Sequence, residues 1–292
     1  MTPSAVAPRT AATDLAIPAT DGFPLAATEV VPAGASTLTV LVAPATGVKR
    51  SLYRAFAAWL AARGFTAVTW DWRGTGGSRP PSLRGFEATM SEHWARRDLA
   101  GVIAWAAARH PDTPLVAVGH SFGGQAFGLA PNAGALRAVV TVAAQSGYWG
   151  HYPAPAAWRY VALWYAVMPG LTRLLGYFPA RLLGLGEDLP RGVALQWARW
   201  CRTPEYLGDF TGHARFAAPL LAYSFDDDPY ATARAVDWLH ARYGSTTRER
   251  RHLAPRDLGV PRIGHLGFFR PDAETLWHET VAWFSRSVRP AA

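Results

Sequence analysis

The chain has 292 residues, half of them hydrophobic, and a formal net charge of +8. This length suits one core of about 200 residues or more with an insertion, and so large an apolar fraction excludes a generally disordered chain. The charge does not by itself indicate a nucleic-acid partner, because Lys49 is the only lysine and the arginines are scattered along the chain.

The cellular setting follows from what the sequence lacks. Cys201 is the only cysteine and cannot form an internal disulfide, so we expect a cytoplasmic protein. Residues 1–13 have no continuous apolar stretch and are typical of a flexible tail rather than a signal peptide. No segment reaches the roughly 18 apolar residues that a membrane span needs, so no stable membrane insertion is expected. The oligomeric state is not predicted.

From about Leu25 the chain alternates short β-rich runs with helical patterns, which is typical of parallel strands joined by crossover helices. The fold expected is therefore α/β, with a mostly parallel central sheet and helices on both faces. In chain order the expected elements are strands at 37–43, 65–70, 115–118, 137–144, 219–225 and 248–254, and helices at 51–64, 91–110, after residue 121, through 236–243 and from 272.

The alternation is interrupted between residues 147 and 213, where aromatic residues, Leu, Arg, Pro and Gly recur with helical spacing and no strand candidate appears. We expect a helical lid here, flanked by the two parts of the core at 14–146 and 214–288. Its aromatic residues either form a pocket for an acyl group or merely attach the lid to the sheet. They are Trp149, Trp158, Trp164, Trp197, Trp200, Tyr148, Tyr152, Tyr160 and Tyr165.

The stretch LVAVGHSFGGQ, residues 115–125, places Ser121 between Gly119 and Gly123 directly after a β-rich run. A helix-compatible run follows, so this serine is predicted to lie on a sharp strand-to-helix turn at the carboxyl end of a central strand, where open α/β sheets bind ligands. The backbone N–H of Phe122 would then be free to stabilise an oxyanion. The alternative is a helix-capping serine with no catalytic role.

A nucleophilic serine needs a histidine as base and a carboxylate to orient it, in loops after later strands. FDDDP offers Asp226, Asp227 and Asp228 directly after one strand, and RIGHLGFFR offers His265 after the last strand. Competing histidines are less suitable, because they lie in predicted helices, in a strand or beside the serine itself: His240, His278, His252 and His120.

Together these segments resemble the α/β-hydrolase superfamily, serine hydrolases with a helical lid, over about residues 14–286 and most closely bacterial predicted hydrolases with a P-A-T-G loop. The resemblance rests on GHSFGG, on DWRGTGGS at 71–78, on DDDP, on the late GH and on APATG. It implies that Asp228, the last aspartate of its loop, is the catalytic acid. Phe225 stands where the family has glycine, so Asp227 remains an alternative.

The resemblance also implies a second oxyanion donor. In many relatives His-Gly follows the strand that here ends in VLVAP, and a backbone N–H just beyond that pair is the donor. Pro44 and Ala45 occupy the matching positions, which makes Thr46 the expected donor. Proline itself has no N–H.

Other chemistries lack their signatures. Arg79 occupies the position of the third glycine that a dinucleotide fingerprint requires, and the sequence contains neither a phosphate loop nor zinc-ligand spacing. No cofactor or metal is therefore expected, and the expected partner is a small-molecule acyl substrate.

The hypothesis is a serine hydrolase that cleaves an ester or thioester of an apolar acyl group through an acyl-enzyme. An amidase, an acyltransferase or an interfacial lipase could use the same residues. A non-catalytic binding protein on the hydrolase scaffold and a basic nucleic-acid binder are the alternatives from other classes.

Overall fold

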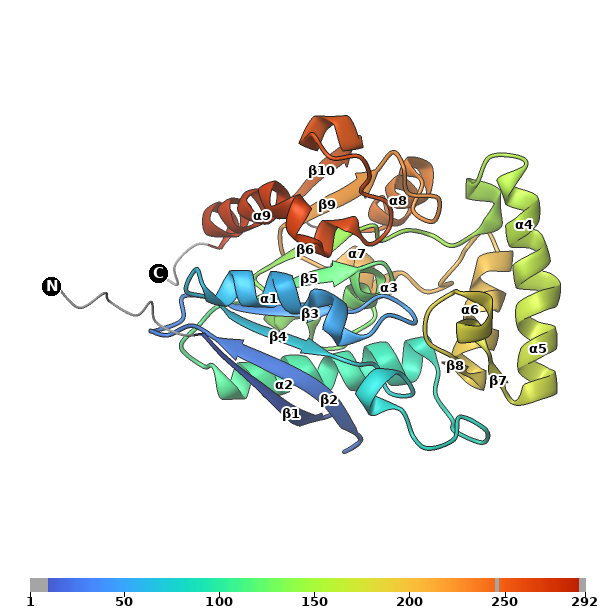
Figure 1. Cartoon of the computed structure of the whole chain (residues 1–292), viewed down its shortest axis with the longest axis horizontal. Coiled ribbons are helices and arrows are strands. Elements are labelled where there is room, and N and C mark those ends of the chain that lie inside the picture. Colours follow the sequence, from blue (N-terminus) through green and yellow to red (C-terminus); the bar gives the residue numbers. More distant parts are fainter. Residues whose placement is uncertain (1–9, 245–246, 289–292) are drawn as a thin grey trace, which may run out of the picture.

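An eight-stranded sheet forms the centre of the computed structural model, which describes residues 10–244 and 247–288 (Figure 1). Its strand order is β1-β2-β4-β3-β5-β6-β9-β10, and all pairs are parallel except β1–β2 and β2–β4. This is the mostly parallel α/β sheet that the sequence predicts. The strands are β1 (Ala11–Pro18), β2 (Pro24–Val31), β3 (Thr39–Ala43), β4 (Thr66–Trp70), β5 (Leu115–His120), β6 (Ala138–Val142), β9 (Leu220–Phe225) and β10 (Arg248–Leu253).

Helices cover both faces of the sheet, as predicted (Figure 1). On one face Phe56 and Trp277 pack together with their ring centroids 5.3 Å apart. On the other face Val102 and Ile103 are buried. The helices of this core are α1 (Arg54–Ala61), α2 (Ala100–Arg109), which continues a π-helical segment at Met90–Leu99, α3 (Phe122–Gln125), α7 (Thr211–Arg215), α8 (Ala233–His240) and α9 (Glu274–Ser287).

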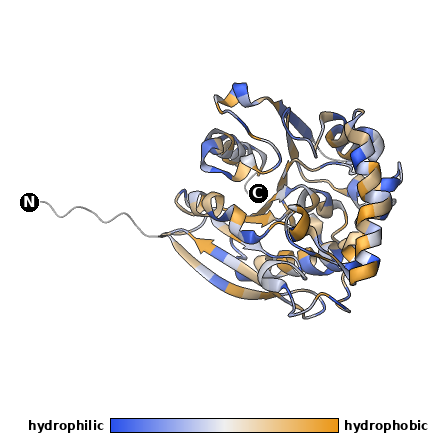
Figure 2. Cartoon of the chain, turned by 45° about the vertical axis from the view of Figure 1, so that its right-hand side comes forward, coloured by the Kyte–Doolittle hydropathy of each residue, from blue (hydrophilic) through white to orange (hydrophobic). Residues whose placement is uncertain are grey.

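The central strands are buried along their whole length because helices lie on both sides of them. Successive residues of a strand point to opposite faces, so Leu41 joins the hydrophobic cluster on one face and Val42 joins the cluster on the other. Figure 2 shows hydrophobic residues both in these strands and in the helices around them.

The regular elements of the expected lid region, residues 147–213, are helices and one short strand pair. Figure 1 shows its helices α4, α5 and α6 together at one end of the sheet. The strand pair was not predicted, because two residues per strand leave no periodic pattern. The elements are α4 (Ala156–Ala162), a π-helical segment at Leu163–Val167, α5 (Met168–Leu175), β7 (Tyr177–Phe178), β8 (Leu189–Pro190) and α6 (Arg191–Arg202).

The beginning of the chain differs from the prediction. Residues 11–13, expected in a flexible tail, belong to β1, which pairs antiparallel with β2 at the edge of the sheet. Residues 1–9 of that expected tail lie outside the described residues. The hairpin was missed because AATDLAIP is mostly exposed and lacks the strict alternation of a half-buried strand.

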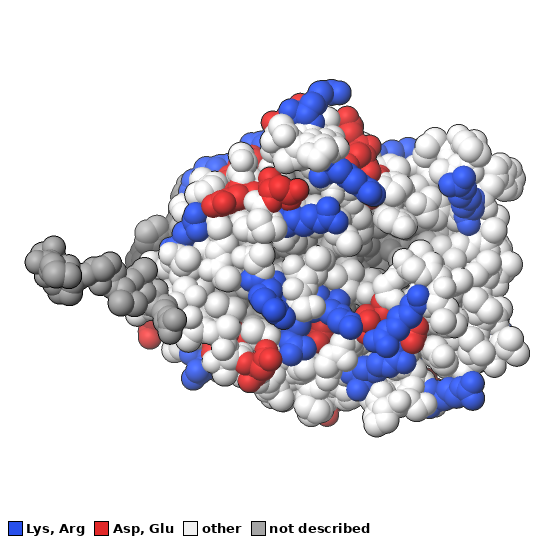
Figure 3. All heavy atoms as spheres, in the orientation of Figure 1, with Lys and Arg blue, Asp and Glu red and all other residues white. Residues whose placement is uncertain are grey.

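Charged side chains of both signs share the surface. Figure 3 shows Arg and Lys interspersed with Asp and Glu over the sheet end of this face. Edge strand β10 is rich in arginine, and its charges are paired: Arg251 contacts Glu279 at 2.9 Å and Arg250 contacts Asp237 at 2.8 Å. The expectation that the protein does not bind nucleic acid remains a prediction. Within the described residues no helix is both long and apolar enough to cross a membrane.

His240, in the core beside β6, is held as a neutral ring. Its Nδ1–H donates to the carbonyl of Val236 at 2.7 Å, and the hydroxyl of Thr141 donates to its Nε2 at 2.8 Å. Burial lowers the pKa of His240 from its ordinary value of 6.5 to about 4. The unfolded chain therefore binds a proton between these two pH values while the folded chain does not.

We expect the free energy of unfolding to fall as the pH decreases from 6.5 to 4, with this one histidine contributing about 3 kcal/mol. The sign follows because protons bind preferentially to the unfolded state in this window. Urea unfolding across the pH range measures the slope. His240→Gln should give a shallower decline than wild type. His278→Gln, whose side chain is 60% exposed, should not; equal slopes for wild type and His240→Gln would contradict the assignment.

Candidate active site

Ser121 lies on a sharp turn between β5 and α3, at the carboxyl edge of the sheet. Its backbone has φ 52° and ψ −116°, a conformation that residues other than glycine rarely adopt. The turn is fixed because the N–H of Ser121 donates to the carbonyl of Val142 at 2.8 Å and its carbonyl accepts from Gly124 at 3.0 Å. The expected helix after the turn spans four residues and is followed by a 3₁₀ turn.

The glycines around Ser121 are required by close packing. A Cβ on Gly119 would lie 2.5 Å from Cα of Gly124, and a Cβ on Gly123 would overlap the carbonyl of Ala43 in the neighbouring strand β3. Because no side chain fits at either position, the helix can begin directly against the sheet. The Gly-x-Ser-x-Gly pattern therefore has a steric basis in this chain.

His265 and Asp228 are joined by a hydrogen bond of 2.8 Å from Nδ1–H to Oδ2. The Asp228 side chain is fully buried, and its other oxygen accepts from the N–H groups of Tyr230 at 2.8 Å and Ala231 at 3.0 Å. These donors stabilise the carboxylate. Because Asp228 accepts the proton of Nδ1, the proton of a neutral His265 ring lies on Nδ1, and Nε2 keeps a lone pair.

The neighbouring aspartates have other partners. Asp227, the alternative acid, accepts from the backbone N–H groups of Ile263 and Gly264, both at 2.9 Å. These bonds connect the loop at residues 226–228 (the acid loop) to the loop before His265. Asp226 contacts His252 at 2.8 Å on the edge strand. Of the three, Asp228 is the one hydrogen-bonded to the imidazole of His265.

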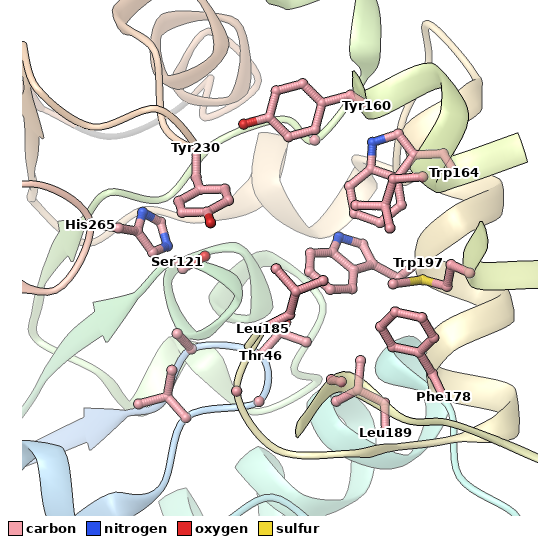
Figure 4. Close-up of a pocket in the computed structure, with 18 of the residues that line it drawn as sticks. Thr46, Ser121, Tyr160, Trp164, Phe178, Leu185, Leu189, Trp197, Tyr230 and His265 are labelled. Atoms are coloured by element: carbon pink, nitrogen blue, oxygen red, sulfur yellow. The ribbon is translucent and has the colours of Figure 1, made fainter. Parts of the chain in front are cut away.

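Ser121 and His265 line the same end of one cavity (Figure 4). Within the described part of the chain, the Ser121 hydroxyl and Nε2 of His265 are not hydrogen-bonded to each other. The structure thus contains the expected hydrogen bond between His265 and Asp228, but not the expected hydrogen bond between His265 and Ser121. In enzymes without bound substrate, such contacts are often long and tighten only in the complex.

The two expected oxyanion donors have backbone N–H groups without partners among the described residues. Phe122 is the first residue of α3, so its N–H has no acceptor within the helix. Thr46 lines the cavity with Ser121, whereas the N–H of Ala45 donates to the hydroxyl of Tyr53 at 2.9 Å. Unlike Ala45, Thr46 therefore keeps an N–H that remains available.

The cavity has a volume of about 240 Å³ and is mainly apolar. Figure 4 shows Phe178 and Leu189 at the opposite end from Ser121 and His265. Of the aromatic residues named from the sequence, Tyr152, Tyr160, Trp164 and Trp197 line it, while Trp158 and Tyr165 are exposed. Its other apolar or aromatic walls are Ala45, Val48, Leu163, Met168, Ala180, Leu185, Tyr230 and Leu266.

The helical insertion is hydrogen-bonded to the loops that carry the site. The hydroxyls of Tyr152 and Tyr160 donate to the carbonyls of Tyr230 and Pro229, both at 2.8 Å, directly after Asp228. The N–H of Glu187 donates to the carbonyl of Gly47 at 2.8 Å, directly after Thr46. The segment that encloses the cavity thus also touches the acid loop and the loop after β3.

Two residues beside the site were not selected from the sequence. Tyr53 and His120 are fully buried and hydrogen-bonded to each other at 2.9 Å. His120 was set aside as the neighbour of the serine, and Tyr53 appears as an ordinary residue at the start of a helix. Neither could be found by spacing, because Tyr53 and His120 lie 67 residues apart in the chain and His265, the other partner of His120, lies a further 145 residues away.

The described residues contain no cluster of three or more His, Cys, Asp or Glu that could hold a metal ion. The expectation that no cofactor is needed remains a prediction.

Known proteins give an independent comparison. The family described as serine aminopeptidase, S33, matches residues 35–178, a range that includes Thr46, Ser121 and Phe122. The chain belongs to the α/β-hydrolase superfamily. It is a serine hydrolase, as the sequence predicts. The matched range ends before Asp228 and His265, so the comparison does not bear on those two residues of the hydrolase.

Solved α/β-hydrolase structures share the fold at low sequence identity. A soluble variant of monoglyceride lipase from Saccharomyces cerevisiae, in complex with a substrate analog, is 14% identical over the whole of both chains, with a TM-score of 0.70. The esterase domain of a Rhodothermus marinus protein is 17% identical over 96% of this chain and 100% of that one, with a TM-score of 0.62. An esterase of Pyrococcus furiosus is 14% identical over 96% and 94%, with a TM-score of 0.62. Among proteins of curated function, none matches the hydrolase in sequence.

Proposed function

We propose that this hydrolase is an esterase or thioesterase that cleaves apolar acyl groups through Ser121, His265 and Asp228. The observation that carries the proposal is the 2.8 Å hydrogen bond between Asp228 and His265, beside a serine on a strained turn that lines the same apolar cavity. A histidine oriented by a carboxylate next to a serine hydroxyl is the arrangement that activates serine as a nucleophile.

In the proposed acylation step, Nε2 of His265 takes the hydroxyl proton as Ser121 Oγ attacks the carbonyl carbon of the substrate. Asp228 holds the proton on Nδ1 and stabilises the imidazolium that forms. Negative charge develops on the carbonyl oxygen, where the free N–H groups of Phe122 and Thr46 would donate to it. The imidazolium then gives its proton to the leaving alcohol or thiol as the carbonyl re-forms.

In the second step a water molecule replaces the leaving group. His265 removes a proton from this water, which attacks the acyl-serine, and the same two N–H groups again receive the oxyanion. Collapse releases the carboxylic acid and returns the proton to Ser121. The product of the cycle is a free acid with an apolar chain.

The cavity favours an acyl group over a peptide. An aminopeptidase must bind a substrate ammonium group, which a carboxylate usually neutralises. No Asp or Glu is among the described residues that line the cavity, and its far end consists of side chains such as Phe178, Leu189 and Trp197. The structural neighbours named as esterases and as a monoglyceride lipase support the same choice of substrate bond.

The proposal also assigns a role to the helical insertion, a partner and a cellular compartment. Residues 147–213 serve as a lid that supplies most of the acyl pocket, between core segments 14–146 and 214–288. The partner is a small acyl substrate, and the place of action is the cytoplasm, where the buried thiol of Cys201 stays reduced.

Replacing Ser121 with Ala should lower kcat for a p-nitrophenyl ester by at least about 1,000-fold, because no other group can form the acyl-enzyme. A fluorophosphonate probe should label the wild type and fail to label the variant. Ser285→Ala, on the outer helix α9, is the matched control and should behave as wild type. An unlabelled wild-type protein would favour the non-catalytic binding protein instead.

Asp228→Asn should reduce kcat by about 1,000-fold or more, since an amide cannot hold the required tautomer of His265. Asp227→Asn should reduce it by only about tenfold, because Asp227 contacts backbone N–H groups rather than the imidazole. Both variants introduce the same chemical change at adjacent positions, and steady-state ester hydrolysis compares them. A larger loss in Asp227→Asn would identify Asp227 as the acid.

For the wild type, kcat/KM should rise with acyl length from acetate until the chain fills the cavity, since each buried methylene contributes about 0.8 kcal/mol. Leu189→Phe, at the far end, should lower kcat/KM for the longest good substrate by about tenfold and leave acetate unchanged. Leu174→Phe, at a position 79% exposed, is the control. A panel of p-nitrophenyl esters and acyl thioesters gives the comparison, and a wild type that prefers acetate would contradict an apolar acyl pocket.

A further inference from the structure

Tyr53 and His120 form a buried polar pair that the proposed reaction does not use. Tyr53 directly precedes α1, and His120 is the last residue of β5, immediately before Ser121. Neither has any exposed surface. Polar groups this deep in a core must find partners, because an unpaired one costs about 1–3 kcal/mol.

The directions of the hydrogen bonds follow from the atoms at each end. His120 Nε2 lies 2.8 Å from the carbonyl oxygen of His265, which can only accept, so Nε2 carries the proton. Burial lowers the pKa of His120, so the ring is neutral and Nδ1 accepts. The Tyr53 hydroxyl therefore donates to Nδ1 at 2.9 Å and accepts from the N–H of Ala45 at 2.9 Å.

These bonds make one continuous chain from Ala45 through Tyr53 and His120 to His265. One end is the residue before Thr46, the proposed oxyanion donor, and the other end is the backbone of the proposed base. We propose that Tyr53 and His120 are positioning residues that hold these two groups in register with Ser121. The inference rests on the proposed function and adds two residues to its machinery.

The packing around the chain supports a positioning role. The ring centroid of Phe269 lies 4.6 Å from that of Tyr53 and 5.0 Å from that of His120. Phe269 therefore packs against both rings and restricts their orientation. The adjoining carbonyl of Pro44 accepts from the indole N–H of Trp72 at 2.9 Å. With the Pro44 carbonyl and the Ala45 N–H both bound to the core, the peptide N–H that follows, that of Thr46, is left for the cavity.

Tyr53→Phe tests the inference, because it removes the hydroxyl that joins Ala45 to His120 and keeps the ring. We expect kcat to fall by about 10- to 100-fold with KM little changed, since the oxyanion donor matters in the transition state and not in substrate binding. Affinity for a boronic acid, which forms a tetrahedral adduct with the serine, should fall by the same factor. Tyr243→Phe also deletes a buried hydroxyl, one that donates to Gly124 at 3.2 Å, and should stay within about twofold of wild type.

His120→Phe and the double variant show whether the two residues act as one unit. In a single chain either break removes the whole effect, so the double variant should be about as active as the worse single variant. Losses that multiply, or a Tyr53→Phe variant as active as wild type, would overturn the inference.

A readout independent of activity separates this inference from the proposed function. ¹⁵N NMR of the histidine rings should show His120 with Nε2 protonated and Nδ1 unprotonated, with the signals assigned by their loss in His120→Phe. Protonation at Nδ1 would overturn the positioning chain even in an active esterase. Failure of wild type to react with a fluorophosphonate, with the expected tautomer present, would instead remove the proposed function and with it any positioning role.

Discussion

The left-handed backbone of Ser121 is the constraint on which the geometry of the site depends. It is held by hydrogen bonds to Val142 and Gly124, and it is possible only because Gly123 lets α3 begin against β3 without a side chain in between. The turn also separates two neighbouring side chains, because Ser121 faces the cavity while His120 is enclosed in the core. One strained residue thus determines that the Ser121 hydroxyl faces the cavity while the His120 ring bonds to the loops behind it.

Adjacent aspartates divide two tasks that one carboxylate could not perform. Asp227 binds the backbone of the loop before His265, and Asp228 binds the ring of His265 itself. A fully buried carboxylate is tolerated at Asp228 because two N–H groups and the imidazole satisfy its oxygens. The position of the loop and the orientation of the His265 ring are therefore fixed independently, which matters for the proposed role of His265 as the base of Ser121.

The sequence predicted the parts of this protein that depend on local pattern. The buried parallel strands and the turn at Ser121 are readable because periodicity and glycine spacing are local properties. The edge strand β1 was missed because it is exposed, and the pairing of Asp228 rather than Asp227 with His265 was left open because adjacent residues differ only in where their side chains point. Tyr53 was missed because His120, to which its hydroxyl is hydrogen-bonded, lies 67 residues away in the sequence.

The insertion links the shape of the cavity to the geometry of the site. Tyr152 and Tyr160 line the cavity and donate hydrogen bonds to the backbone directly after Asp228. Gly186, next to Glu187, packs so closely on Gly47 that a Cβ there would lie 2.5 Å from the Gly47 carbonyl oxygen. Any displacement of the insertion that widens the cavity must break these contacts, and so must loosen the acid loop and the loop of Thr46 together. The residues that line the cavity and those proposed to react with the substrate are therefore mechanically coupled.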